Sequence, residues 1–420
     1  MNRLSFVIVA LVAGCDVADE ANFDASDADL MMKAPKIGAI LRSTGASIPL
    51  ADQVATPVLS AVAGAGNWVV TGKATAVNFG DADYARCVLL AGGVQVDASA
   101  TLVGNASPGF TGELGPSAAT LVVQAVVPLV ANTTIEMQCL HDGFQTGVYL
   151  DPGASLRMFK SAGAQSAVNG GAVNVSTFGS TTVASLKRKN VQVAIFGKAT
   201  PVSFADNDYV RGTLETGGAI LDASATLIGV GASGPTGERG PSAATVEMLG
   251  LHAFGPVKAT LSLGVVHDFA TQGIYVDPAA SLITVPSTSA ELTTSSAATV
   301  LATDGSNTEA VATVLPAGNY ALSAKATAVN FGAADYVRCV LLEDGAQLDA
   351  STTLVGNAAP GFTGELGPSA ATLGVQSIVT STGVETYSLS CGHDNVSAGE
   401  YLDPGAALLA VPVTGKLDIQ

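Results

Sequence analysis

The sequence predicts an all-β protein of three tandem antiparallel β-sandwich domains that follow a signal peptide and an acidic linker. A segment of about 125 residues recurs three times, apolar and polar residues alternate within it, and turns rich in Gly and Pro separate the alternating runs. The chain has 420 residues, 47 glycines and 18 lysines and arginines. It is therefore long enough for three domains and lacks the charged heptads of helical proteins.

The first residues predict export. Arg3 precedes an apolar run over residues 4–12, and small residues then lead to Cys15. This order resembles the bacterial lipobox, so we expect a lipoprotein signal peptide over residues 1–14 and lipidation of Cys15. An ordinary signal peptide that contains a cysteine is the alternative. Residues 15–35 predict an acidic flexible tether. The protein would then be exported to the bacterial cell envelope or cell surface, with only its lipid in the membrane.

Three motifs define the repeat. A Lys-Ala-Thr core recurs at residues 72–79, 197–204 and 324–331. Gly-Pro-Ser-Ala-Ala-Thr and a closing Tyr-x-Asp-Pro also recur, at residues 115–120, 240–245 and 367–372 and at residues 149–152, 275–278 and 401–404. The predicted domains are residues 36–160, 161–286 and 287–415. Since the period far exceeds that of solenoid repeats, each copy should own a hydrophobic core.

The third copy illustrates the expected strands. Tyr320, Leu322 and Ala324 alternate with Ser323 and Lys325, which predicts a strand buried on one face. A strand over residues 337–342 should turn at Asp344-Gly345 and return from residue 347, because Asp-Gly favours a tight hairpin. The first two copies have Gly-Gly there, at residues 92–93 and 217–218. Further strands are expected at residues 371–378, 385–391 and 406–411, and only residues around 51–62 could hold much helix.

The remaining cysteines predict two disulfides. Aligning the copies places Cys87 over Cys339 and Cys139 over Cys391, whereas the middle copy has Gly212 and Val265 at these positions. Joint absence is expected of bonded partners, so we predict the pairs Cys87–Cys139 and Cys339–Cys391. A zinc site is the alternative, but structural zinc usually requires closely spaced cysteine pairs. The middle copy should be the least stable unless its core compensates.

Two motifs contain residues that could support chemistry. His-Asp recurs at residues 141–142, 267–268 and 393–394, and Asp-Tyr recurs at residues 83–84, 208–209 and 335–336, with an Arg two residues after each Tyr. We interpret both motifs as turn-ordering, with no metal or cofactor. The alternatives are a metal bound by three converging histidines and a calcium loop, for which the motif supplies too few oxygens.

The Gly-rich loops are the best candidate contact surface. These Gly/Pro loops cover residues 109–117 and 234–242 and the equivalent segment of the third copy, which contains Phe362. Each has Gly at every third position, and three triplets are too few for a collagen helix. They predict surface loops that contact a ligand. The candidate contact residues are Phe110, Glu113, Glu238, Arg239, Phe362 and Glu365.

The order of motifs is similar to that of C1q and tumour-necrosis-factor head domains. In the third copy residues 316–320 precede a strand, residues 342–345 form a turn, and residues 401–404 lead into a final strand. The resemblance also extends to uncharacterised secreted bacterial β-sandwich domains. It implies a jelly-roll sandwich and an intrachain pseudo-trimer. The paired cysteines and the Gly/Pro loop depart from C1q heads.

Charge and motifs limit the functions. The net charge of −17 argues against nucleic acid as a partner. No nucleophile elbow or phosphate loop is present, so we expect a non-enzymatic binding or adhesion lipoprotein with a protein or glycan ligand. The alternatives are a structural envelope or coat component, and a carbohydrate-active enzyme or carbohydrate-binding protein. Trp68 is the single tryptophan, which argues against repeated sugar-stacking sites.

Overall fold

The computed structural model describes residues 37–105, 114–143, 147–176, 179–229, 240–268, 273–357, 366–394 and 399–420. These residues form strands and turns without any helix, and the strands pair in antiparallel sheets of which none is closed. Ile37–Gln420 forms one compact unit. Among the residues described, no helix has the length and hydrophobicity needed to cross a bilayer.

The described part of the first copy contains ten strands. They are β1 (Ile37–Ser43), β2 (Ile48–Pro49), β3 (Thr56–Ala63), β4 (Gly66–Val77), β5 (Asp83–Ala91), β6 (Val94–Val103), β7 (Ala118–Leu129), β8 (Thr133–His141), β9 (Tyr149–Leu150) and β10 (Ser155–Lys160). One sheet has the order β1–β10–β4–β7, with β9 beside β4 and β2 beside β9, and a second has the order β3–β8–β5–β6. The helix considered possible around residues 51–62 was wrong: residues 56–63 form strand β3 against β8, in which exposed Ser60 and Val62 alternate with buried Ala61 and Ala63.

The second and third copies repeat this order. The second contains β11 (Gln165–Val168), β12 (Val173–Asn174), β13 (Thr181–Arg188), β14 (Val191–Ala199), β15 (Pro201–Val202), β16 (Asp208–Thr216), β17 (Ala219–Ile228), β18 (Val246–Phe254), β19 (Ala259–His267), β20 (Tyr275–Val276) and β21 (Ser281–Pro286). The third contains β22 (Glu291–Thr294), β23 (Thr299–Val300), β24 (Thr308–Val314), β25 (Gly318–Val329), β26 (Asp335–Glu343), β27 (Ala346–Val355), β28 (Ala370–Ser381), β29 (Thr386–His393), β30 (Tyr401–Leu402) and β31 (Ala407–Pro412). Their sheets run β11–β21–β14–β18 with β13–β19–β16–β17, and β22–β31–β25–β28 with β24–β29–β26–β27.

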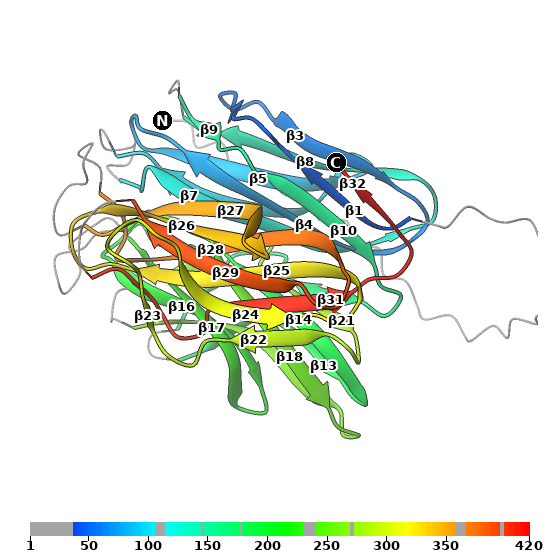
Figure 1. Ribbon diagram of the computed structural model, residues 1–420. Helices are drawn as coiled ribbons and strands as arrows, with labels where there is room; N and C mark the ends of the chain where they lie inside the picture. The colour runs from blue at the N-terminus through cyan, green and yellow to red at the C-terminus, as the bar shows by residue number, and fades with distance from the viewer. Residues whose placement is uncertain are drawn as a thin grey trace, which may run out of the picture. The chain divides into compact units, whose positions relative to one another are not determined.

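The last strand, β32 (Lys416–Ile419), joins the first copy. It pairs in parallel with β1, and Arg42 forms an ion pair with Asp418 at 2.7 Å. Figure 1 shows β32 beside β1. The end of the third copy is therefore held against the beginning of the first.

The hairpin turns follow the sequence prediction. Asp344 and Gly345 have φ angles of 47° and 84°, and the glycine pairs at residues 92–93 and 217–218 have similar positive values. These turns join β5 to β6, β16 to β17 and β26 to β27. Gly, Asn and Asp adopt this conformation at the lowest cost, which explains the residues at all three turns.

Both predicted disulfides are present. Cys87 is bonded to Cys139 and Cys339 to Cys391, and each pair joins directly opposed residues on neighbouring strands. In the middle copy Gly212 faces Val265 in the same register. Met248 packs so closely against Gly212 that a Cβ there would meet its sulfur. A larger core side chain thus occupies the place of the missing disulfide.

Each copy owns a hydrophobic cluster, and further clusters are shared between copies. The largest shared cluster contains Leu41 and Phe159 from the first copy, Phe196 from the second, and Leu409 and Val411 from the third. Contact between copies explains why one prediction was wrong. Strand β25 is buried on both faces rather than one, because Ser323 and Lys325 are only 2% and 1% exposed.

Candidate functional site

The polar faces of three equivalent strands form buried ion pairs with other copies. Lys73 on β4 reaches Asp349 at 2.7 Å, Lys198 on β14 reaches Asp97 at 2.7 Å, and Lys325 on β25 reaches Asp222 at 2.9 Å. The contacts run in a cycle, from the first copy to the third, the third to the second, and the second to the first. Each lysine also donates to a backbone carbonyl after the aspartate, namely that of Ala350, Ala98 or Ala223.

Each aspartate also accepts a hydrogen bond within its own copy, which positions its carboxylate for the lysine. The backbone amides of Gln124, Leu249 and Gln376 donate to Asp97, Asp222 and Asp349, respectively, at 2.6–2.8 Å. Burial raises the pKa of Asp97 and lowers the pKa of Lys198, and each charge moves the other's pKa back toward its ordinary value. A charge buried this deeply is tolerated only with its partner, so the pairs enforce one register between copies.

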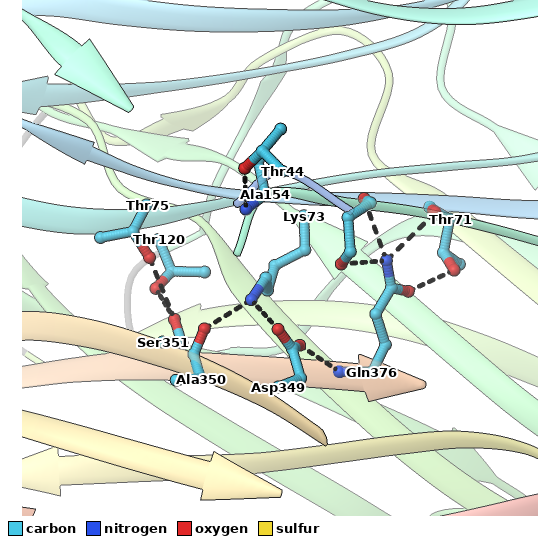
Figure 2. A network of polar contacts seen from close by, with 11 residues as sticks. Thr44, Thr71, Lys73, Thr75, Thr120, Ala154, Asp349, Ala350, Ser351 and Gln376 are labelled. Carbon is cyan, nitrogen blue, oxygen red and sulfur yellow. Dashed lines mark hydrogen bonds and ion pairs between the residues drawn. The ribbon is translucent and has the colours of Figure 1, made fainter. Parts of the chain in front are cut away.

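Figure 2 shows the interface of the first and third copies. The Gln376 side chain donates to the carbonyl and the hydroxyl of Ser155 and to the carbonyl of Thr71, at 3.0–3.2 Å. In return, Thr71 donates to Gln376 Oε1 at 2.5 Å. Ser351 lies between the hydroxyls of Thr75 and Thr120. The polar groups on these strand faces are thus hydrogen-bonded to another copy instead of to water.

Tyrosines of the Asp-Tyr motif bond to serines of the Gly-Pro-Ser motif in another copy. The hydroxyl pairs are Tyr84 with Ser242, Tyr209 with Ser369 and Tyr336 with Ser117. They join the same pairs of copies as the ion pairs but run in the opposite sense, from the first copy to the second, the second to the third and the third to the first. Tyr84 and Tyr336 are buried, and each bonds to a serine of the neighbouring copy.

The bases of the three Gly/Pro loops converge. In the first copy Gly115 donates to the carbonyl of Gly104, and Gly104 donates to that of Pro116, at 2.9 and 2.8 Å. The same bonds join residues 229, 240 and 241 and residues 356, 367 and 368. A cavity of about 110 Å³ is lined by the loop bases of all three copies, including Pro116, Pro241 and Pro368. Asn105 of the first copy also donates to the carbonyl of Leu366 in the third copy at 3.0 Å. We call this part of the molecule the convergent end.

A smaller cavity lies next to the convergent end. It measures about 20 Å³ and is lined by four equivalent residues of each copy, among them Thr101, Thr226 and Thr353. The hydroxyls of these threonines donate to backbone carbonyls of other copies, those of Ala243, Ala370 and Ala118. This volume is sufficient for about one water molecule and no larger ligand.

The predicted contact residues lie outside the described part of the chain. This applies to Phe110, Glu113, Glu238, Arg239, Phe362 and Glu365, and also to Cys15. The structure does describe one exposed phenylalanine per copy next to the loop bases: Phe79, Phe204 and Phe331 are 55%, 53% and 48% exposed. Each follows a residue whose backbone amide bonds to the carbonyl of the Gly-Pro-Ser serine. The sequence analysis missed these residues, although Phe closes the Lys-Ala-Thr motif in every copy.

The repeated His-Asp and Asp-Tyr motifs meet within each copy. The Nδ1 atoms of His141, His267 and His393 lie 2.8–2.9 Å from a carboxylate oxygen of Asp83, Asp208 and Asp335, respectively. In the first two copies the Asp after the His pairs with the motif's Arg, as in Arg86–Asp142 and Arg211–Asp268. Each histidine is thus held by its own copy. Among the described residues, the group that could hold a metal contains one histidine, His393, together with Asp335 and Glu400.

A larger pocket lies in the first copy. It has a volume of about 590 Å³ and is lined by Pro49, Leu50, His141, Val148 and Tyr149, with Asp52 and Asp151. Burial raises the pKa of Asp151, and Arg338 from the third copy partly offsets this. The volume suits a small ligand. Trp68, in contrast, is fully buried, and its indole donates to the carbonyl of Gly64 at 2.7 Å. It therefore offers no surface for stacking a sugar.

The sequence analysis also missed the lysine–aspartate interface. The signal was a Lys in the middle of a strand of small residues, repeated in every copy, and an Asp-Ala-Ser repeated at residues 97–99, 222–224 and 349–351. A charge conserved at the same place in three apolar strands indicates a partner in the interior.

Comparison with known proteins gives no further assignment. No protein-family model matches the chain, and no curated protein sequence matches it significantly.

Proposed function

We propose that the chain is a non-enzymatic binding or adhesion protein whose three copies form one pseudo-threefold head. In this proposal each copy is a jelly-roll sandwich. Nested strand pairing in the second copy supports it: the first strand pairs with the last, β13 with β19, β14 with β18, and β16 with β17. The cyclic ion pairs and tyrosine–serine pairs support the pseudo-trimer, and the resemblance to C1q-type heads is consistent with both.

The single observation that carries the binding function is the convergent end. Three loop bases meet around one cavity, and Phe79, Phe204 and Phe331 are exposed beside them. Aromatic side chains exposed in a repeated array favour contact with a partner. Three equivalent contacts on one rigid head also raise avidity without a strong individual site. The ligand class is a protein or a glycan at the cell surface.

The proposed location is the bacterial cell envelope, with the head tethered through a lipid on Cys15. The lipobox-like residues before Cys15 and the acidic segment over residues 15–35 support it. A structural envelope or coat role is the second candidate. The shared core and the buried ion pairs favour it, because they stabilise the head regardless of a ligand.

Binding can be tested with a glycan array and with intact bacterial and host cells. The variant Phe79→Ser/Phe204→Ser/Phe331→Ser removes the exposed aromatics, and Val130→Ser/Val257→Ser/Val384→Ser is the matched control. Each control valine is 79–98% exposed in a turn at the opposite end of the sheets. We expect the native protein and the control to bind, and the phenylalanine variant to lose binding with an unchanged melting temperature. Absence of binding by the native protein, or equal binding by both variants, would contradict the proposal.

A further inference from the structure

Within the described ranges, the third copy is the one that has a buried group of three potential metal ligands. Asp335 begins β26, His393 ends β29, and Glu400 directly precedes β30. Their ligand atoms lie within 4.8 Å of one another, and none of the three residues is more than 1% exposed. Two lie at the ends of strands and the third directly before another strand, so a bound ion would join three segments of the copy.

The other two copies provide an internal comparison. They contain the same Asp–His pair, but the residue seven positions after the histidine is Val148 or Ile274 instead of Glu400. Val148 and Ile274 are each 2% exposed, so this position is buried in every copy. The fold therefore requires only an apolar side chain here, and the third copy has replaced it with a carboxylate.

A buried carboxylate needs compensation for its charge. Glu400 accepts a hydrogen bond from Asn330 at 2.7 Å, and its other oxygen lies 3.6 Å from His393 Nδ1, which is 2.9 Å from Asp335. Two carboxylates thus face one imidazole. A single positive charge on the imidazole would neutralise only one of the two carboxylates. The second negative charge would remain, and two buried negative charges close together repel each other.

The second ring nitrogen of His393 adds to the cost of burying this group. Its Nε2 atom is buried and has no hydrogen-bond partner among the described residues. A structural histidine would be held at both nitrogens, and leaving one buried without a partner costs about 1–3 kcal/mol. A proton on Nε2 carries this cost whether His393 is an imidazolium or a metal ligand through Nδ1. A divalent ion can compensate for this cost by neutralising both carboxylates, whereas an imidazolium neutralises only one of them.

We propose that Asp335, His393 and Glu400 bind one divalent metal ion of the zinc class. One imidazole nitrogen and two carboxylate oxygens match the three-ligand set of Zn²⁺, which leaves a further position for water. Calcium requires six or more oxygens, more than these residues supply.

The ion would stabilise the turn that presents Phe331 at the convergent end. Asn330, which bonds to Glu400, also donates to the carbonyl of Ala333 at 2.7 Å and directly precedes the exposed Phe331. A metal at this position joins β26, β29 and β30 to the turn that presents Phe331. The site itself is independent of the proposed ligand-binding function.

Titration calorimetry tests the site. The full chain, free of any affinity tag and stripped with a chelator, is titrated with ZnCl₂ and in parallel with CaCl₂. We expect one Zn²⁺ per chain, no Ca²⁺ binding, and a higher melting temperature with zinc. Glu400→Val, which restores the first copy's residue, and His393→Gln should each weaken zinc binding at least about 100-fold.

The matched control is His141→Gln, the same change in the copy that lacks the third ligand. It should leave the zinc affinity unchanged. Glu400→Gln keeps the size of the side chain and replaces Glu400→Val if that variant fails to fold. Failure of the native chain to bind zinc, full affinity in the Glu400 variant, or an equal loss in His141→Gln would each overturn the proposal.

Discussion

Single buried charges define how the copies meet. Lys198 and Asp97 are both inaccessible to solvent, whereas the Arg211–Asp268 pair has side chains 49% and 35% exposed. Removing one partner of a buried pair leaves an uncompensated charge in the interior, while an exposed pair is screened by water. The two kinds of pair should therefore differ strongly in their effect on stability.

We predict that Lys198→Met lowers the free energy of unfolding by about 3–5 kcal/mol. Arg211→Met should lower it by about 1 kcal/mol or less. Adding Asp97→Leu to Lys198→Met should recover much of the loss, because no buried charge then remains. Urea unfolding of the variants measures these differences. Equal effects of the two single variants would show that Lys198 is not buried against Asp97.

Glu247 makes stability depend on pH. Burial raises its pKa from 4.5 to about 7, with nearby Arg157 lowering it in part. The unfolded chain releases this proton near pH 4.5 and the folded chain near pH 7. The folded state therefore binds more protons between these values, and stability falls as pH rises through this window.

Because of Glu247, the free energy of unfolding should fall by about 3 kcal/mol as the pH rises from 4.5 to 7, and this loss is complete above pH 7. Glu247→Gln should remove this part of the pH dependence and be more stable than the native protein at pH 8. Thermal melting of both proteins from pH 4.5 to 8 checks this. Parallel stability curves for the two proteins would exclude a raised pKa of Glu247.

At the scale of strands, the alternation of apolar and polar residues predicted where the strands lie but not what covers each of their faces. The third copy's strands lie within a few residues of their predicted positions, since the apolar period and the Asp344-Gly345 turn are local signals. The same alternation predicted a solvent face for Ser323 and Lys325, which is in fact an interface. A polar strand face looks alike in sequence whether water or another polar face covers it.

The position that holds a disulfide in the first and third copies is filled by the packed side chain of Met248 in the second. Cys339 and Cys391 are separated by 52 residues, and closing such a loop stabilises the folded state by about 4 kcal/mol on the chain-entropy account. We predict that Cys339→Ala/Cys391→Ala lowers the unfolding free energy by about this amount. Cys87→Ala/Cys139→Ala should have a similar effect. Denaturant unfolding of both variants provides the measurement, and unchanged midpoints would contradict it.

At the scale of the molecule, covalent linkage permits asymmetry. Arg157 lies at a position where the other copies have Ile283 and Leu409, and it is buried against the carbonyl of Leu322 and the hydroxyl of Ser323. Glu247 has Val122 and Gly374 as its counterparts, and a side chain on Gly374 would overlap its carboxylate. Three separate identical chains would bring three arginines or three glutamates together, whereas one chain can place one of each.

Contacts between copies could not be derived from the sequence for a physical reason. Within a copy, period and turn chemistry act over a few residues, so strands, hairpins and disulfide partners were predictable. The pair Lys73–Asp349 spans 276 residues, and no local pattern specifies which Asp a buried Lys will meet. The group of Asp335, His393 and Glu400 was missed for the same reason, because Glu400 differs from its counterparts by a single residue.

The central claim is that the three copies close into one unit through contacts between the first and the third. Small-angle scattering of the chain from residue 37 onward tests it most directly. A compact particle of this length should have a radius of gyration of about 21 Å. A profile of an extended string, with a radius well above this value and unaffected by Lys73→Met, would contradict it.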